Sequence, residues 1–393
     1  MAAHPSTLMR PAENAIPKSL FNVCFVLFVF NASFFPAAYF LHSWIYDLNG
    51  LGIPTDFVNV WAAGRMVLDG HPALAYDWDL QKQVGLDVLK QDFIGYFAWH
   101  YPPPFLFVAS LLAMLPYLAV MRAIVGRAFG LLLAVGFPMV LSNTLVGQNG
   151  FLTAALIGGT LYLLPTRKVL SGICLGLLTY KPQYGFLFPI VLIAASEWTV
   201  FFTAAATAAV VALASWLAFG TESWQAFFHW MPTFSQAFLV EGKATWWKLQ
   251  SLYSLVRYLG GAEQVAWIFQ WVLTAAVAAT LVAMWRSHVR YSLKAAALAV
   301  GALLTTPYLF MYDMMVLAIP VAYLVRLGIA SGFRAYELPA LAFAASLIVI
   351  FILFGIPVGF AATATVGVLV LRRAGPWWRP APAPAALAAA IGA

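Results

Sequence analysis

The sequence predicts an all-α membrane protein with many transmembrane helices. Of its 393 residues, 63% are hydrophobic and only 9% are charged, whereas a soluble domain carries about a quarter charged residues. Apolar runs long enough to cross a bilayer recur from one end of the chain to the other. Because such runs satisfy their backbone hydrogen bonds in lipid as helices, we expect a polytopic bundle of about twelve spans, within a range of roughly ten to thirteen.

The expected spans form one transmembrane domain, residues 20–371, between an N-terminal segment, 1–19, and a Pro/Ala-rich tail, 372–393, that is expected to be disordered. The first apolar stretch is too long for the core of a signal peptide, so we interpret it as an uncleaved span. Four spans are short, and tilted, kinked or re-entrant segments are expected there. In order, the spans are roughly 20–41, 102–119, 123–141, 151–164, 169–180, 184–196, 199–219, 264–285, 293–306, 308–325, 338–355 and 357–371.

The basic residues indicate how the chain is oriented. If the N-terminus is cytoplasmic and the spans alternate, both termini lie inside, and the basic residues concentrate in the inner segments, as the positive-inside rule requires. The net charge of +7 is then explained by topology, and no nucleic-acid partner is expected. Of the 21 Lys and Arg residues, 14 lie on the inner side: Arg10, Lys18, Arg122, Arg127, Arg167, Lys168, Arg286, Arg290, Lys294, Arg326, Arg334, Arg372, Arg373 and Arg379.

The same topology collects the polar segments on the non-cytoplasmic side. They are a long first outer loop at 42–101, the turn at 147–149, Lys181, a second long outer loop at 220–262, and the 305–313 segment. Candidate functional groups are therefore expected together at one face of the membrane.

An acidic residue near the start of the first outer loop is the leading candidate. The loop is expected to contain amphipathic helices on the membrane surface, the first beginning near Thr55 as a possible N-cap. Asp56, Asn59 and Ala63 then share one face of that helix. Two interpretations remain open: Asp56 is a functional carboxylate, or it is an acid that favours the positive end of a helix.

Aromatic side chains flank both outer loops. His100 and Tyr101, before three prolines, are expected at the depth of the lipid headgroups, as are Trp246 and Trp247 in the second loop. They are either members of an aromatic belt or part of a substrate site, His100 and Tyr101 as the lining of a cavity and the two tryptophans stacked on a sugar ring or prenyl chain.

Four polar groups lie between apolar segments. Gln148 and Asn149 sit in a turn and could donate hydrogen bonds to sugar hydroxyls, although Gly and Asn are common in any turn. Lys181 could extend to the interface or contact a lipid phosphate. Asp313 follows Pro307 within an apolar run and is expected to pair with a cation such as Lys181, either as a structural salt bridge or at a substrate site.

Taken in order, these pieces resemble glycosyltransferase family 87, membrane enzymes of the GT-C superfamily. The resemblance extends over roughly residues 20 to 330. Each motif is degenerate alone, and the order and spacing carry the similarity. The motifs are Asp56-Phe57, Ala62-Ala63, Leu68-Asp69-Gly70, Leu74-Ala75-Tyr76-Asp77, Tyr101-Pro102-Pro103, Gly147-Gln148-Asn149, Gly172 with Gly176-Leu177, Lys181-Pro182, Gln250-Ser251-Leu252 and Thr306-Pro307 with Tyr312-Asp313.

The resemblance implies a GT-C-like bundle and a transferase that moves a hexose, typically mannose, from a polyprenyl-phosphate donor to a hydroxyl on a lipid or glycan acceptor. It places the enzyme in the inner or plasma membrane, among membrane lipids, with its site on the non-cytoplasmic side. The catalytic acid of the family corresponds to Asp56. Because Thr306 and Tyr312-Asp313 stand where some relatives carry a Ser-Pro and a histidine-bearing segment, the donor sugar and the role of Asp313 stay open.

The implied chemistry assigns further residues. Asp56 would act as general base toward the acceptor hydroxyl, and the configuration at the anomeric carbon would invert. Lys181, with Arg65 or Arg257 as helpers, would stabilise the charge that develops on the phosphate, and no cofactor or essential metal is expected. The remaining candidates for binding the donor phosphate or sugar are Gln148, Asn149, Tyr101, Tyr312, Asp313 and Ser251.

Two other classes also fit about twelve spans. A secondary transporter or lipid flippase would carry ionisable residues along a path at mid-membrane and show two related halves, whereas here the polar groups collect at one face. Another lipid-linked glycan transferase or ligase would be expected to rely on a large late outer loop.

Overall fold

The structure is a computed structural model that describes residues 15–97, 99–107, 114–126, 128–242 and 246–375. Within these ranges every regular element is a helix, apart from isolated bridges such as that between Leu249 and Phe310. The all-α prediction is therefore confirmed for the described residues. The predictions for residues 1–14, for the disordered tail from 376 onward, and for the middle of the span at 102–119 lie outside them.

The chain contains long helices and a run of shorter ones between α1 and α10. Five short 3₁₀ segments used below are η2 (Pro72–Tyr76), η3 (Pro103–Phe107), η6 (Pro182–Tyr184), η8 (Trp246–Lys248) and η9 (Met311–Leu317). The α-helices are α1 (Lys18–Phe40), α2 (Phe57–Leu68), α3 (Trp78–Leu89), α4 (Met114–Val125), α5 (Phe129–Val135), α6 (Met139–Val146), α7 (Gly150–Leu163), α8 (Lys168–Leu177), α9 (Leu187–Ala194), α10 (Trp198–Ser235), α11 (Leu252–Tyr258), α12 (Glu263–Arg286), α13 (Tyr291–Leu304), α14 (Ala318–Ser331), α15 (Glu337–Phe354) and α16 (Gly359–Ala374).

The predicted number of spans is not confirmed in the described residues. Five helical segments in the described chain are long and apolar enough to cross a membrane, and a sixth is added if α5 and α6, bent by 56°, are one broken span. The predicted spans near α7, α8, α9 and α13 are helical but short. A helix of 14 residues is about 21 Å long, less than the roughly 30 Å of a hydrocarbon core. The polytopic class holds, but the count of about twelve is not confirmed.

The stretch predicted as a second long outer loop, 220–262, is largely helical. Helix α10 bends sharply at Gly220, where the backbone has φ 75° and ψ 171°, and a second arm continues to Ser235. A π-helical turn (Gln236–Val240), η8 and α11 follow. This region carries enough apolar and aromatic residues to form a helix, although most side chains of the second arm of α10 stay exposed or half-buried.

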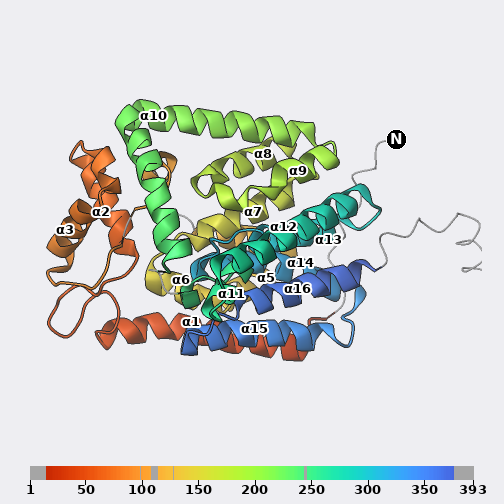
Figure 1. The fold of residues 1–393 in the computed structure, drawn as a ribbon. Helices are drawn as coiled ribbons and strands as arrows, with labels where there is room; N and C mark the ends of the chain where they lie inside the picture. Colours follow the sequence, from red (N-terminus) through yellow and green to blue (C-terminus); the bar gives the residue numbers. More distant parts are fainter. Residues whose placement is uncertain (1–14, 98, 108–113, 127, 243–245, 376–393) are drawn as a thin grey trace, which may run out of the picture.

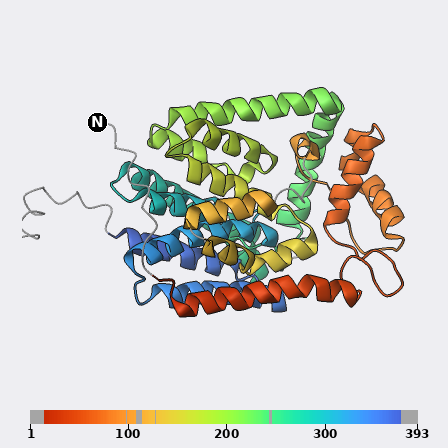
Figure 2. The ribbon, with the colours of Figure 1, turned by 180° about the vertical axis from the view of Figure 1, so that it is seen from behind.

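The helices of the bundle lie roughly along one direction, and the first outer loop sits at one end (Figure 1). There, α2 and α3 form a separate cap, and the second arm of α10 runs between this cap and the bundle, as both views show (Figures 1 and 2). The start of α1 and the end of α16 lie at the opposite end. This arrangement agrees with the predicted grouping of the outer segments.

Helices α7, α13 and α14 occupy the centre of the bundle, with most of their residues buried. The peripheral helices α1, α10, α12 and α15 instead expose large apolar side chains, for example Val26, Leu217, Val272 and Phe343. Water would disfavour so much exposed apolar surface, whereas lipid accepts it. The periphery is therefore suited to a bilayer.

Candidate functional site

Asp56 is the residue immediately before helix α2, in the cap. It occupies the N-cap position, with φ −59° and ψ −17°. The sequence predicts Thr55 at this position, so the N-cap lies one residue later than predicted. The Asp56 side chain accepts no capping hydrogen bond from the helix backbone. The partly buried carboxylate is therefore not used to cap the helix, which removes the local contact expected of a purely structural acid at this position.

The carboxylate is held instead by a residue from the bundle. Nε2 of Gln148 donates to Oδ2 of Asp56 over 3.1 Å. The hydroxyl of Tyr101 donates to Oε1 of the same amide over 2.9 Å, and this contact directs the Gln148 NH₂ group toward Asp56. Tyr76 in turn donates to the backbone carbonyl of Tyr101 over 2.9 Å. The acid is thus positioned by a buried chain of hydrogen bonds that links the cap to the bundle.

Two glycines allow the Gln148 turn to approach its neighbours. Gly147 ends α6 with φ 67°, and a Cβ there would lie 2.7 Å from Cβ of Phe57. Gly150 begins α7, and a Cβ there would lie 2.2 Å from the backbone oxygen of Tyr312. Larger residues at either position would push the turn away from Asp56 or from the 305–313 segment.

Asp56 and Gln148 line a cavity of about 450 Å³ between the cap and the bundle. Its walls come from four separate parts of the chain: the cap, the turn after α6, the region from α10 to η8, and the start of η9. Asp56 and Lys248 are the acidic and basic residues in the described lining. The other lining residues include Asn59, Trp78, Tyr96, Phe97, His100, Phe238, Phe310 and Tyr312. Aromatic rings with a few polar groups are the usual walls of a site for small polar ligands.

A buried ion pair lies beneath this cavity. Nζ of Lys181, before η6, is 2.6 Å from Oδ1 of Asp313, and their side chains are only 3% and 1% exposed. Tyr184 donates to Oδ2 of Asp313 over 2.8 Å. The Lys181 ammonium also lies 4.8 Å from the ring centre of Tyr312. The predicted pairing of Asp313 with Lys181 is confirmed, and Lys181 does not extend to an interface.

The pair does not line the cavity. Tyr312 does, and the Lys181 ammonium lies over the ring of this tyrosine. Two unlike charges this close and this buried stabilise each other strongly, provided that both are present. The geometry assigns the pair a role in holding η6 against η9, whereas a contact between Lys181 and a donor phosphate stays a prediction.

Three other predicted residues lie outside the cavity lining. Arg65 is exposed and pairs with Asp69 at 3.0 Å on the surface of α2. Arg257 donates to the backbone carbonyls of Val240 and Gly261. Ser251 caps α11, and its hydroxyl donates to the carbonyl of Pro307 over 2.9 Å. Each side chain thus has a structural partner that explains its position.

Asn149 and the tryptophan pair also lie outside the lining. Asn149 is buried directly before α7, and Gln148 is the residue of this turn that faces the cavity. Trp246 packs near Tyr253, and Trp247 lies near Phe351. Of the aromatic residues considered from the sequence, His100 and Tyr312 line the cavity, whereas Tyr101 is fully buried beneath Gln148.

The surroundings of Asp56 alter its acidity. Burial raises the pKa of the Asp56 carboxyl above its ordinary value of 3.8, since a charge in a poorly solvated site is disfavoured. The hydrogen bond from Gln148 and the charges of Lys248 and Lys181 lower the pKa and offset part of this effect. A carboxylate with a raised pKa accepts a proton more readily, which suits a general base.

Lys248 is a site residue that the sequence did not single out. It lies at the end of η8 and is a cavity residue with a charge opposite to that of Asp56. The only signal in the sequence was a lysine beside two tryptophans, which is also common at membrane interfaces. Its place opposite Asp56 depends on contacts between segments far apart in the chain.

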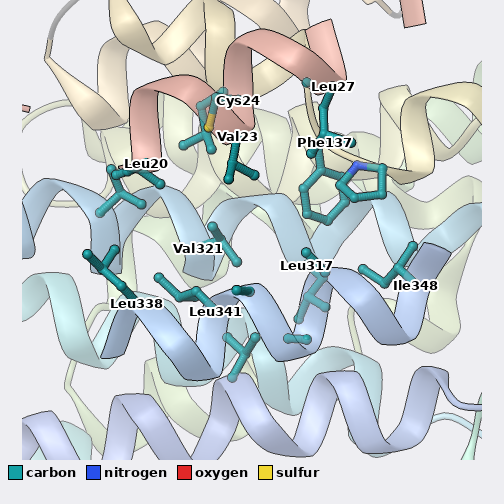
Figure 3. Close-up of a pocket in the computed structure, with 18 of the residues that line it drawn as sticks. Leu20, Val23, Cys24, Leu27, Phe137, Leu317, Val321, Leu338, Leu341 and Ile348 are labelled. Atoms are coloured by element: carbon teal, nitrogen blue, oxygen red, sulfur yellow. The ribbon is translucent and has the colours of Figure 1, made fainter. Parts of the chain in front are cut away.

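A second pocket, of about 160 Å³, lies between the peripheral helices α1 and α15 and the central helix α14 (Figure 3). Leu20 and Val23 from α1, Leu317 and Val321 near the start of α14, and Leu341 from α15 point into it (Figure 3). The lining residues that the structure describes include no charged side chain, so they offer no group for acid–base chemistry.

The described residues contain no group of three or more His, Cys, Asp or Glu side chains that could hold a metal ion. The expectation that no metal or cofactor is essential stays a prediction, because the chemistry itself is not tested by this arrangement.

The comparison with known proteins bears on residues 120–311. This region matches the family model of glycosyltransferase family 87. It contains Gln148, Lys181 and Lys248, whereas Asp56 precedes it and Asp313 follows it. No curated protein and no solved structure matches the chain. The match confirms the resemblance of the motifs for residues 120–311, slightly less than half of the chain, and this similarity to family 87 indicates a membrane glycosyltransferase.

Proposed function

We propose that this glycosyltransferase moves a hexose, most often mannose in enzymes of this kind, from a polyprenyl-phosphate donor to a hydroxyl group of a lipid or glycan acceptor. The reaction takes place in the cavity between the cap and the bundle. The observation that carries the proposal is the Asp56 carboxylate, which is not used as a helix cap, is held by Gln148 and lines that cavity.

Asp56 is the general base of the proposed reaction. Gln148 donates a hydrogen bond to Oδ2. No hydrogen bond from the described residues reaches Oδ1, so this oxygen can receive the proton of the acceptor hydroxyl. The acceptor oxygen forms a bond to the anomeric carbon while the bond from that carbon to the phosphate oxygen breaks. The electron pair of the broken bond stays on the polyprenyl phosphate. Attack and departure occur on opposite faces of the sugar, so the configuration inverts.

The cavity walls supply sugar contacts. Aromatic rings of Trp78, Phe310 and Tyr312 border the space that Asp56 also borders. Such rings cover the apolar faces of a sugar, while the amides of Asn59 and Gln148 can hydrogen-bond to its hydroxyl groups. The prenyl chain would remain among the exposed apolar helices and the surrounding lipid.

The proposed location is the inner or plasma membrane, with both termini in the cytoplasm and the cavity on the opposite side. The distribution of Lys and Arg supports this orientation. The separation of the cap from the start of α1 and the end of α16 is compatible with it (Figures 1 and 2).

A transfer assay tests the proposal. Membranes that contain the full chain would be incubated with radiolabelled polyprenyl-phosphate mannose, and new labelled lipid or glycan would be sought. Membranes with Asp56→Asn are the matched control, because asparagine keeps the size of the side chain but does not accept the proton. Labelled product with the wild type and little with the variant supports the proposal.

Two results would contradict it. Movement of the donor across the membrane without any transfer would favour a transporter or flippase. Transfer of a whole preassembled glycan, with none from the single-sugar donor, would favour a ligase.

A further inference from the structure

We propose that Lys248 is the cation that binds the phosphate of the donor lipid in this cavity. The inference rests on the proposed function and names a residue that neither the motifs nor the family match indicates.

Lys248 lines the proposed donor cavity, and its ammonium group forms no direct ion pair with a carboxylate of the described residues. It ends η8 and lines the same cavity as Asp56. In the part of the chain that the structure describes, no carboxylate oxygen lies within 4.0 Å of its ammonium group. The ammonium lies 5.6 Å from the ring centre of Trp247, a contact that attracts a cation without neutralising it. Its charge acts on Asp56 at longer range but is not held in a direct ion pair, so the ammonium can still bind an anionic ligand.

The other candidate cations are already occupied. Lys181 is paired with Asp313, Arg65 is paired with Asp69, and Arg257 binds two backbone carbonyls. None of them lines the cavity. A phosphate in this space would therefore meet Lys248 before any of these three.

The backbone beside Lys248 is held firmly. The amide of Gln250 donates to the carbonyl of Leu309 over 2.7 Å, and the amide of Gly359 donates to Oε1 of Gln250 over 2.8 Å. Leu249, fully buried, forms a bridge with Phe310. These contacts fix η8 against the 305–313 segment, which also supplies Tyr312 to the cavity. The backbone next to Lys248 is therefore fixed in position.

The two opposite charges would orient the donor. The phosphate is attracted to Lys248 and repelled by Asp56, so the sugar end of the donor is directed toward the base. As the bond between the anomeric carbon and the phosphate oxygen breaks, the phosphate changes from a diester with one negative charge to a monoester with nearly two. A fixed ammonium stabilises the second state more than the first and therefore favours departure.

The test measures binding and transfer separately. The full-length protein in detergent, immobilised, would be titrated with radiolabelled undecaprenyl phosphate, which carries the leaving group but no sugar. For Lys248→Gln we expect binding to weaken on the order of ten- to a hundredfold, the value of one charge-assisted contact. Lys248→Arg should retain most of the binding. Asp56→Asn should bind the phosphate more tightly, because a repelling charge is removed.

A matched control separates a specific contact from general charge. Lys90→Asn removes one positive charge from the exposed end of α3, in the cap, at a left-handed position that asparagine tolerates. Its binding should equal that of the wild type. Equal loss in Lys90→Asn and Lys248→Gln would show that only the overall charge matters and would overturn the proposal.

The outcomes distinguish this inference from the function on which it rests. If the wild type binds undecaprenyl phosphate and Lys248→Gln binds it equally well, Lys248 is not the phosphate ligand, although the proposed function stands. If the wild type neither binds the phosphate nor transfers sugar, the donor class itself is wrong. A variant that binds weakly but unfolds at the wild-type temperature supports the proposal.

Discussion

Gln148 and Asp56 are 92 positions apart, and Nε2 of the amide lies 3.1 Å from Oδ2 of the acid. This hydrogen bond joins the cap to the turn between α6 and α7. Its direction is set by Tyr101, which donates to the other end of the same amide. The position and the proton affinity of the proposed base therefore depend on one turn of the bundle, and several predictions concern this turn.

Replacing Asp56 by asparagine should reduce sugar transfer while leaving the fold intact. The amide has nearly the same shape, but it does not remove a proton from the acceptor, so we expect a fall of about 10²- to 10⁴-fold. The rate would be measured with purified protein and saturating donor. Asp87→Asn, an exposed acid on α3 of the same cap, should transfer at the wild-type rate. Full turnover by Asp56→Asn would exclude Asp56 as the base.

The transfer rate should fall on acidification at a higher pH than an ordinary carboxylate would produce. The base works only when it is ionised, and burial raises the pKa of Asp56 above 3.8. Removing the Gln148 hydrogen bond with Gln148→Leu removes an interaction that lowers this pKa, so the acidic limb of the rate profile should move further upward. If the acidic limb of Gln148→Leu stays fixed or moves to lower pH, the assignment of Asp56 as the titrating base is contradicted.

Tyr101→Phe should lower the rate of transfer more than it lowers stability. Loss of one buried hydrogen bond costs about 1 kcal/mol in the free energy of unfolding, but here it also releases the orientation of Gln148. Tyr117→Phe is the matched control, since its hydroxyl donates over 3.1 Å to the carbonyl of Ala134 and does not reach the cavity. Both variants should unfold at similar temperatures, and only Tyr101→Phe should lose activity. Equal activities would show that the Gln148 orientation is unimportant.

Lys181→Met should strongly destabilise the protein. The substitution leaves the Asp313 carboxylate buried without its cation, which costs about 3–5 kcal/mol. The double variant Lys181→Met/Asp313→Leu removes both charges and should recover part of this loss. Thermal unfolding in detergent measures both. If the single variant unfolds at the wild-type temperature, the pair contributes little to the packing of η6 against η9.

Gly150→Ala should destabilise the protein and disturb the cavity. A Cβ at this position would lie 2.2 Å from the backbone oxygen of Tyr312, so one segment has to move, at a cost of about 1–3 kcal/mol. Gly64→Ala in α2 is the control, because a Cβ there has no neighbour within 4 Å and alanine favours a helix by about 1 kcal/mol. Similar unfolding temperatures for the two variants would argue against the close contact.

Much of the fold could be predicted because it depends on local composition. The apolar segments near 18–40, 263–286 and 337–354 are helices where hydropathy placed them. Hydropathy does not reveal bends, which depend on packing. The sequence therefore does not indicate the arm of α10 beyond Gly220 or the 56° bend between α5 and α6, and the predicted number of complete spans is not confirmed in the described residues.

The candidate site was only partly predictable for the same reason. The sequence indicates Asp56, Gln148 and Tyr312, which line one cavity, and it predicts the pairing of Lys181 with Asp313. Arg65, Arg257 and Ser251 were named on their motifs or charge alone and have other structural partners. The sequence does not indicate Lys248, because nothing near it in the chain shows that it lines the same cavity as Asp56.

By itself, the sequence determined that this chain belongs in a membrane, which segments are apolar, and which acid stands at the start of the first outer helix. These properties depend only on the order of residues along the chain. Only the tertiary structure decided which charges neutralise one another and which remain available, since Lys181 and Asp313 are 132 positions apart. Burial and distance set the energy of a charge, and both depend on how the helices pack.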